Sequence, residues 1–480
     1  MESKFKGFSN CTIIIIFIFT FCFCSCKKLI GVNPPITATT NTSVFSTDAN
    51  AASVLTGLYA TLSQGGFVEG SSGISLLSGL SADEFTLFNG VSNTSTMYYY
   101  YTNTLFVSAL SSAGTENWSG FYNDIYTCNV AIEGISVSNS LTPAVQQQLL
   151  GEAKFMRAFL YFYLVNLYGP VPLATTSDYE VNSELPRSSI SDVYKQIIAD
   201  LTDAEALLSS NYVSADAITA TSERVRPTKW AAAALLARVY LYTGDYADAE
   251  KFSTEVIGNT SLYQMTLLDD VFLKNSQEAI WQLQPVFSGI NTADAPVFVI
   301  PSTGPSSNYP VYLSNSLLNS FSVGDERRLH WVDSVIVGDS TYYFPYKYKV
   351  AVYNAPVTEY LMVLRLGEQY LIRGEARVQQ GESSAVDDLN VLLNRAGLSN
   401  YSGPTDKNSL LNVIMNQRRI ELFSEWGNRW LDLKRMGNVD AVMSVACPQK
   451  GGTWNSYQQL YPISFSDIER DQNLTQNIGY

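Results

Sequence analysis

The stretch 151-GEAKFMRAFLYFYLVNLYGPVPL-173 decides the fold class of this chain. From position 149 to position 167, apolar residues recur at steps of three and four, and that spacing places them on one face of an α-helix. Gly169 and Pro170 predict that the helix ends near Tyr168, because glycine favours the turn after a helix and proline cannot continue one. The stretch therefore predicts a long amphipathic helix in a mostly α-helical domain.

Other segments repeat a helix–turn–helix pattern. In residues 228–257, an alanine-rich helix is expected to end before Gly244-Asp245 and small alanines open the next helix, so the pattern resembles a tetratricopeptide (TPR) hairpin. Residues 367–397 repeat the arrangement with a stop at Gly381, and residues 118–168 are expected to contain another hairpin. Because the copies are scattered along the chain, we predict TPR-type hairpins as a scaffold, with large insertions and a few short strands.

Two insertions differ in composition from the helical segments. Residues 64–115 are rich in Gly, Ser, Thr and Tyr, and residues 285–357 carry several Pro with many Ser and Asn. Within the second insertion, the alternating run at 340–350 predicts a strand or an extended loop. Insertions on one face of a helical scaffold are where binding surfaces are expected, so these two segments are the predicted binding regions.

Composition narrows the range of functions. The 44 acidic residues outnumber the 30 basic ones and give a net charge of −14, which argues against binding to nucleic acid, whose phosphates need a basic surface. Only one histidine is present, and the sequence contains no nucleophile elbow, phosphate-binding loop or zinc-protease motif. Adjacent carboxylates such as Asp83-Glu84 are expected by chance among so many acids. We therefore expect a protein that is not an enzyme and that holds no cofactor or metal.

The first 25 residues are interpreted as a signal peptide. An apolar run from Ile13 to Phe23 follows two lysines, and it is shorter than the ~20 residues that a membrane-spanning helix needs. The segment ends in Ser25-Cys26, which resembles a bacterial lipobox, so we expect Cys26 to be lipidated and to attach the chain to a membrane. Cleavage nearby without a lipid is the alternative. Residues 26–45 would then be an anchor and flexible tether, and residues 46–480 the folded domain.

Three stretches, taken in order, resemble the SusD/RagB family of nutrient-binding lipoproteins of Bacteroidetes. They are EAKFMRA running on to LYGPVP at 152–172, QRRIEL running on to WGNRWLDLKR at 417–435, and YPIS followed by NLTQNIGY at 461–480. Their order and spacing cover almost the whole chain after the signal segment. The resemblance implies a SusD-like fold, mostly α, in a single domain.

The resemblance also implies a function and a location. It implies an outer-membrane lipoprotein, exposed on the cell surface, that captures a nutrient, most often a glycan, and caps a SusC-like TonB-dependent transporter. We therefore expect this chain to bind an oligosaccharide or polysaccharide and to pass it to such a transporter without breaking a bond.

Three other functions stay open. A peptide-capturing member of the same family would rely on backbone hydrogen bonds and side-chain pockets, whereas the many tyrosines favour a sugar. A TPR interaction scaffold without a small ligand agrees less well with the signal segment and the aromatic insertions. A surface hydrolase would need two carboxyl groups about 5–10 Å apart across a sugar, and turnover of a glycan would support it.

Aromatic residues in the insertions are the main ligand-binding candidates. A sugar presents apolar C–H faces and hydroxyl groups, and tyrosine can cover the first and hydrogen-bond to the second. In a strand, the rings of residues 98–101 would alternate between two faces, so at most two could meet a ligand; packing on the scaffold is the alternative for each. The family resemblance implies binding roles for Asp83 and Tyr309. The candidates are Asp83, Tyr98, Tyr99, Tyr100, Tyr101, Asn103, Tyr309, Tyr312 and Trp331.

The charged segment 417–435 is interpreted as structural. Arg418 should pair with Glu421, and Arg429 with Asp432, because residues three apart meet on one helix face. Apolar residues between them step by four, four and three and form a predicted core stripe. We expect a partly buried ion network that fixes geometry more than it stabilises the fold. Glu152 and Arg157 are interpreted in the same way.

Overall fold

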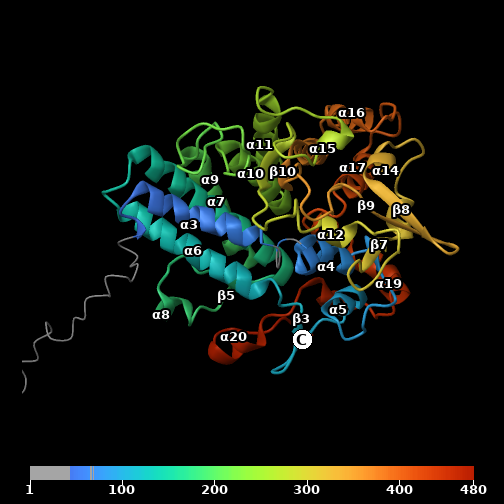
Figure 1. The fold of residues 1–480 in the computed structure, drawn as a ribbon, viewed down its shortest axis with the longest axis horizontal. Coiled ribbons are helices and arrows are strands. Elements are labelled where there is room, and N and C mark those ends of the chain that lie inside the picture. The colour runs from blue at the N-terminus through green and yellow to red at the C-terminus, as the bar shows by residue number, and fades with distance from the viewer. Residues whose placement is uncertain (1–43, 65–67, 69) are drawn as a thin grey trace, which may run out of the picture. The chain divides into compact units, whose positions relative to one another are not determined.

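Helices are the dominant element in the part of the chain that the computed structural model describes, residues 44–64, 68 and 70–480 (Figure 1). The prediction of a mostly α-helical fold with a few short strands is confirmed. Residues 45–480 form one compact unit. The predicted lipidation site Cys26 and the rest of the predicted signal and tether up to residue 43 lie outside the described residues. None of the helices described here is long and apolar enough to span a membrane.

A long buried helix organises the first half of the described chain. It is α7 (Pro143–Tyr168), which has a proline in its first turn and ends at Gly169, where φ is 75°. Almost every residue from Phe155 to Tyr168 is buried, so the helix is covered on more sides than the single apolar face that its spacing predicts. The covering helices are α3 (Asp48–Leu62), α6 (Trp118–Val137) and α9 (Ile190–Leu207).

Helical hairpins continue this scaffold (Figure 1). The first joins α10 (Lys229–Thr243) to α11 (Tyr246–Gly258), and the second joins α15 (Leu366–Gln380) to α16 (Ala385–Arg395). Gly244 and Gly381 end the first helix of each pair with φ of 79° and 81°, a left-handed conformation that glycine adopts at little cost. Helix α10 packs on α9, α11 packs on α15, and α17 (Lys407–Glu421) packs on α15, so helices distant in sequence form a continuous scaffold.

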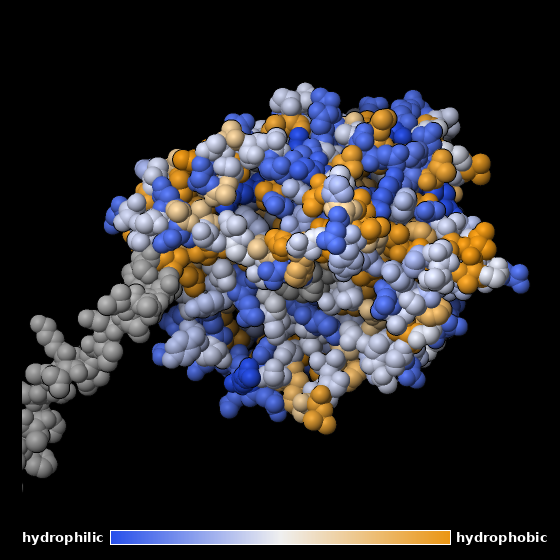
Figure 2. All heavy atoms as spheres, viewed as in Figure 1, coloured by the Kyte–Doolittle hydropathy of each residue, from blue (hydrophilic) through white to orange (hydrophobic). Residues whose placement is uncertain are grey.

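The strands of the described residues form five two-stranded antiparallel sheets. The sheet of β1 and β7 joins the two predicted insertions, because Thr86 lies opposite Tyr312. The alternating run at 340–350 contains β9, and the β8–β9 hairpin lies where hydrophobic residues gather at the right of Figure 2. The pairs are β1 (Phe85–Leu87) with β7 (Val311–Leu313), β2 (Phe106–Val107) with β3 (Ser112–Ala113), β4 (Val171–Pro172) with β5 (Arg187–Ser188), β6 (Ala279–Leu283) with β10 (Leu361–Arg365), and β8 (Val332–Val337) with β9 (Ser340–Pro345).

Short helices occupy the insertions and the C-terminal part. Helix α4, from the first insertion, contacts the C-terminal helix α18, and α5 contacts α19. Helices α5 and α19 lie side by side in Figure 1. The α-helices of this group are α4 (Ile74–Ser81), α5 (Thr96–Thr102), α8 (Tyr179–Asn182), α12 (Ala295–Phe298), α13 (Asn315–Leu318), α14 (Arg327–His330), α18 (Asn428–Arg435), α19 (Val439–Gln449) and α20 (Phe465–Arg470). The 3₁₀ turns are η2 (Gly70–Ser72), η3 (Leu268–Asp270) and η4 (Ser456–Gln459).

The tyrosine run 98–101 is helical rather than extended. Ser95 caps the start of α5 by accepting a hydrogen bond from the Tyr98 N–H at 3.2 Å, and Asn103 follows the helix in a left-handed conformation with φ of 56°. The four rings therefore point around a helix instead of alternating between two faces. Tyr100 is buried and Tyr101 is half-buried.

The ion network predicted for residues 417–435 is present, but the predicted pairs are wrong. Helix α17 ends at Glu421, and the left-handed residues Trp426 and Gly427 turn the chain before α18 begins. Each predicted pair lies within one of these two helices, but its arginine bonds to a more distant carboxylate. Arg418 bonds from Nε to Asp432 at 2.8 Å. Arg429 bonds from Nε to Asp83 at 2.7 Å.

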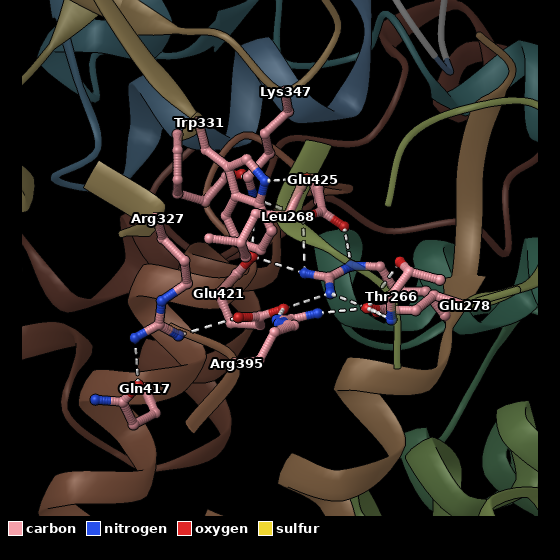
Figure 3. Close-up of polar contacts among 12 residues, drawn as sticks. Thr266, Leu268, Glu278, Arg327, Trp331, Lys347, Arg395, Gln417, Glu421 and Glu425 are labelled. Carbon is pink, nitrogen blue, oxygen red and sulfur yellow. Dashed lines mark hydrogen bonds and ion pairs between the residues drawn. The ribbon is translucent and has the colours of Figure 1, made fainter. Parts of the chain in front are cut away.

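The fully buried Glu421 is the centre of a cluster of charged side chains (Figure 3). Its carboxylate accepts hydrogen bonds from Arg327 at 3.0 Å and from Arg365 at 2.6 Å, and it also pairs with Arg395. Two buried pairs deeper in the scaffold have the same character. Glu152 pairs with Arg226 and Arg157 pairs with Asp200, each at 2.6 Å.

Candidate binding site

A cavity of about 690 Å³ lies where the first insertion meets the C-terminal helices. Polar groups come from β1, from α13 and from the ends of α17 and α18, while one face of α19 supplies small apolar side chains. The lining residues are Asp83, Phe85, Thr86, Tyr101, Ser314, Asn315, Ser316, Arg419, Arg429, Ala441, Val442, Val445, Ala446, Gln449 and Lys450.

Lys450 fixes the segment between α4 and β1 through hydrogen bonds to its backbone. The Lys450 ammonium donates hydrogen bonds to the carbonyl oxygens of Leu80 and Ala82, both at 2.6 Å, next to the C-terminus of α4. The partial negative charge of a helix C-terminus favours a cation there, but burial acts in the opposite direction and lowers the pKa of Lys450 to about 7. Ser314 fixes the other side, because its hydroxyl donates to the Asp83 carbonyl at 2.6 Å. These contacts place the Asp83 side chain at the cavity.

Two arginines converge on the Asp83 carboxylate. Arg429 donates from Nε at 2.7 Å and from Nη2 at 3.1 Å, and Arg419 donates from Nη2 at 2.7 Å. The Ser316 hydroxyl adds a hydrogen bond at 3.2 Å. Burial acts to raise the pKa of Asp83, but Arg419 and Arg429 outweigh it and hold that pKa well below its usual value. Asp83 is therefore a permanent anion at the cavity wall.

The neighbouring carboxyl group, Glu84, is in a different state. It points away from the cavity into the protein, where the Ser424 N–H donates to Oε1 at 3.2 Å. Burial, together with the charge of Asp83, raises the pKa of Glu84 to about 7. The Asp83-Glu84 pair thus holds one charged carboxylate at the cavity and one that changes its protonation near neutral pH.

Of the predicted aromatic residues, Tyr101 belongs to the cavity wall and Tyr312 to the strand that pairs with β1. Tyr101 lines the cavity and is half-buried. Tyr312 lies on β7 opposite Thr86, and the edge of its ring contacts Tyr342 with 5.1 Å between ring centres. Each keeps part of its ring accessible, as a residue that stacks on a sugar must.

Three of the predicted candidates are packing residues. The Tyr100 hydroxyl donates to Glu116 at 2.7 Å from a fully buried ring, and the Asn103 side chain donates to the Ser81 carbonyl at 3.1 Å. Trp331 is fully buried and donates from Nε1 to the Leu268 carbonyl at 2.9 Å (Figure 3). Its ring is covered by the Lys347 ammonium, 4.9 Å from the ring centre. A ligand at the surface cannot reach these side chains, so their prediction as contact residues is corrected.

Like Tyr312, the remaining tyrosine candidates are half-buried and do not line the cavity. Tyr98 and Tyr99 lie on α5, where Tyr99 contacts Phe106 edge to face at 4.9 Å between ring centres. Tyr309 lies in a short turn, in which its N–H donates to the Ser306 carbonyl at 3.1 Å. These three stay predictions.

Sequence reasoning missed the cationic part of the cavity. Arg429 was assigned to the structural network, and Arg419 and Lys450 were not considered as site residues. The signal that could have separated Arg429 from Arg418 is Gly427, since a glycine that breaks a helix also changes the direction in which the following side chains point.

Comparisons with known proteins agree with this architecture. Residues 37–241 match the SusD-like family described as starch-binding and associating with the outer membrane, and residues 334–480 match the SusD family. A SusD-like protein of Bacteroides ovatus is 27% identical over 381 residues, which are 68% of this chain. The match covers 66% of that relative, just under two thirds of its length.

Solved structures share the fold. A SusD superfamily protein from Bacteroides vulgatus superposes with a TM-score of 0.77 at 21% identity, over 90% of this chain and 99% of the other. A laminarin-binding SusD-like protein superposes with a TM-score of 0.73 at 23% identity, over the same shares of the two chains. At these identities the likeness concerns the fold.

Proposed function

The chain belongs to the SusD/RagB family, as the sequence resemblance predicts, and we propose on that basis that it is a glycan-binding protein of the cell surface. The protein would capture an oligosaccharide or polysaccharide and break no bond. The family is described as starch-binding, and a protein of the same fold binds laminarin, so both carbohydrate descriptions favour a sugar over a peptide.

The observation that carries the proposal is the mixed lining of the 690 Å³ cavity. A sugar ring offers C–H faces to apolar surface and hydroxyl groups to polar side chains. Tyr101 and the small apolar residues of α19 supply the first kind of contact, and Asp83, Ser316 and the arginines supply the second. The volume falls within the ~300–1,000 Å³ range of small-molecule sites.

The same geometry disfavours hydrolysis. A glycosidase needs a general acid whose pKa is raised, whereas the arginines hold the pKa of Asp83 well below its usual value. Glu84 has a raised pKa, but its carboxyl group is turned away from the cavity and is buried. A binding role therefore fits the lining better than a catalytic one.

We propose further that Cys26 anchors the chain in the outer membrane and that the partner is a SusC-like TonB-dependent transporter. The description of the family as associating with the outer membrane supports this location. Mass spectrometry of the mature N-terminus and the membrane fractionation of Cys26→Ala test the anchor. Co-purification of the transporter with the full chain tests the partner.

Calorimetry tests the binding function. The chain from residue 27 onward is titrated with maltohexaose, laminarihexaose, xylohexaose, hexagalacturonate and chondroitin sulfate hexasaccharide, with a protein digest as a separate ligand. We expect saturable binding to at least one saccharide, and a loss of affinity in Tyr101→Ala and Tyr312→Ala. Tyr179→Ala is the matched control, because Tyr179 is a 75% exposed tyrosine on the distant helix α8. Binding to peptides alone would contradict the proposal.

A further inference from the structure

The two arginines at Asp83 have donors left over. Arg419 uses only Nη2, on Asp83 and on the Ser316 hydroxyl, and its buried Nε has no partner. Arg429 uses Nε and Nη2 on Asp83. The Nη1 atoms of both arginines form no hydrogen bond within the described residues. The Nε of Arg419 is shielded from solvent, so the donors that an acceptor entering the cavity can meet are the Nη1 groups, which are not among the buried, unpartnered atoms.

The charges that line the cavity do not cancel. Arg419 and Arg429 are cations, and Asp83 is the one carboxylate among the lining residues. The chain as a whole carries a net charge of −14, so this excess of positive charge runs against its composition. Burial lowers the pKa of Lys450 to about 7, so this lysine adds to the positive charge mainly below neutral pH.

We propose that this cavity binds the carboxylate or sulfate group of an acidic saccharide, through the open N–H groups of Arg419 and Arg429. The inference rests on the proposed glycan-binding function and specifies the class of glycan. A planar guanidinium with free N–H groups matches the two oxygens of a carboxylate or sulfate, and a charged acceptor forms a stronger bond than a hydroxyl group. The partly buried position of both arginines limits screening by water.

Matched pairs of saccharides test the proposal. Hexagalacturonate is compared with the same hexasaccharide after reduction of its carboxyl groups, and chondroitin sulfate hexasaccharide with its desulfated form. Affinities are measured by calorimetry at low and at high salt. We expect an acidic member to bind at least about tenfold more tightly than its less charged counterpart, and we expect salt to reduce that advantage.

The outcomes separate this proposal from the glycan-binding function. If neutral saccharides bind as well as the acidic ones, the anion site is overturned and the glycan-binding function stands. If no saccharide of either kind binds, both are overturned. If the acidic members bind and the advantage disappears at high salt, both are supported.

A substitution that adds one negative charge to the cavity wall tests whether the acidic saccharide binds there. Asn315 is exposed, lines the cavity and makes no side-chain hydrogen bond with another described residue, so Asn315→Asp adds a negative charge with almost no change in shape. A unit charge about 4 Å away in water corresponds to a factor of about five in affinity, so the preference for the acidic saccharide should fall about fivefold. The matched control is Asn139→Asp, in the exposed turn between α6 and α7. Equal effects of both variants would place the acidic ligand elsewhere.

Discussion

Glu421 and Asp83 are both carboxylates that gather arginines, but only the Asp83 cluster faces a cavity. Glu421 is held by three arginines whose side chains are at most 7% exposed (Figure 3). Asp83 is held by Arg419 and Arg429, whose side chains are 12% and 13% exposed and line the cavity. The two clusters share residue types and differ in access. Access to the cavity, more than composition, therefore distinguishes a structural cluster from a binding one.

Two arginines of the closed cluster use all their donor nitrogens inside the protein, while the buried Nε of Arg395 has no partner. Arg365 bonds to Glu421 and Glu425, and Arg327 also bonds to Asp325 and Gln417. Lys347 adds hydrogen bonds to the backbone carbonyls of Glu421 and Phe423, both at 2.8 Å. A buried network of this kind is sensitive to the loss of one partner, because the remaining charge is left buried and unpaired.

The largest effect is expected from breaking the closed cluster. Arg365→Met removes the shared partner of two buried glutamates, and we expect the free energy of unfolding to fall by roughly 3–5 kcal/mol. Chemical denaturation measures this loss. Arg470→Met is the control, since Arg470 is exposed and forms no ion pair within the described residues, and it should stay within about 0.5 kcal/mol of the parent. A small loss in Arg365→Met would show that the closed cluster contributes little to stability.

The second prediction uses pH to separate the two neighbouring carboxyl groups. Burial raises the pKa of Glu84 to about 7, so the folded protein binds this proton more tightly than the unfolded chain. The contribution of Glu84 to the free energy of unfolding is therefore fully present below its ordinary pKa of 4.5 and is lost as the pH rises through 7. Between pH 5 and pH 8 the loss should reach up to roughly 3 kcal/mol, and Glu84→Gln should remove most of it.

For Asp83, the pH dependence of stability should have the opposite sign, and Asp83→Asn tests this. Burial alone would raise the pKa of Asp83, but the two arginines hold it below its ordinary value, so its contribution is present at neutral pH and is lost in acid. Urea denaturation from pH 3 to pH 8 should show a flatter profile above pH 5 for Glu84→Gln and a flatter profile in acid for Asp83→Asn. Identical profiles for both variants would contradict the assignment of one charged and one titrating carboxyl group.

Local signals in the sequence are sufficient for the scaffold. The spacing of apolar residues, followed by Gly169-Pro170, predicts α7 and its end correctly, because both signals act within one or two helical turns. Three stretches, taken in order, indicate the SusD-like fold. The tyrosine run shows the limit, since Ser95 and Asn103 determine a short helix while the ring pattern alone is equally compatible with a strand.

The cavity depends on contacts that no local pattern shows. Asp83 and Arg419 are 336 residues apart in sequence, and their pairing follows only from the way α4, β1 and α17 pack. Trp331 is of a residue type that often stacks on a sugar. It is buried here because Lys347 and Leu268, from other parts of the chain, contact it. The family resemblance indicates Asp83, and the aromatic content indicates Tyr101. Neither source indicates that Arg419 and Arg429 line the same cavity.

The smallest expected effect comes from comparing the same conservative change in both clusters. Arg419→Lys keeps the charge and can keep the contact with Asp83, but it removes Nε and Nη1, the donors that Asp83 does not use. We expect affinity for an acidic hexasaccharide to fall about tenfold, or about 1.4 kcal/mol, while the free energy of unfolding changes by less than about 1 kcal/mol.

Arg365→Lys in the closed cluster is the matched variant and should do the reverse, with a clear loss of stability and unchanged affinity, because its lost donors all bind Glu421 and Glu425. Calorimetry and denaturation of the two lysine variants measure both quantities. If Arg419→Lys destabilises the protein and leaves affinity unchanged, the open donors have no ligand, and the Asp83 cluster holds the fold together in the same way as the Glu421 cluster.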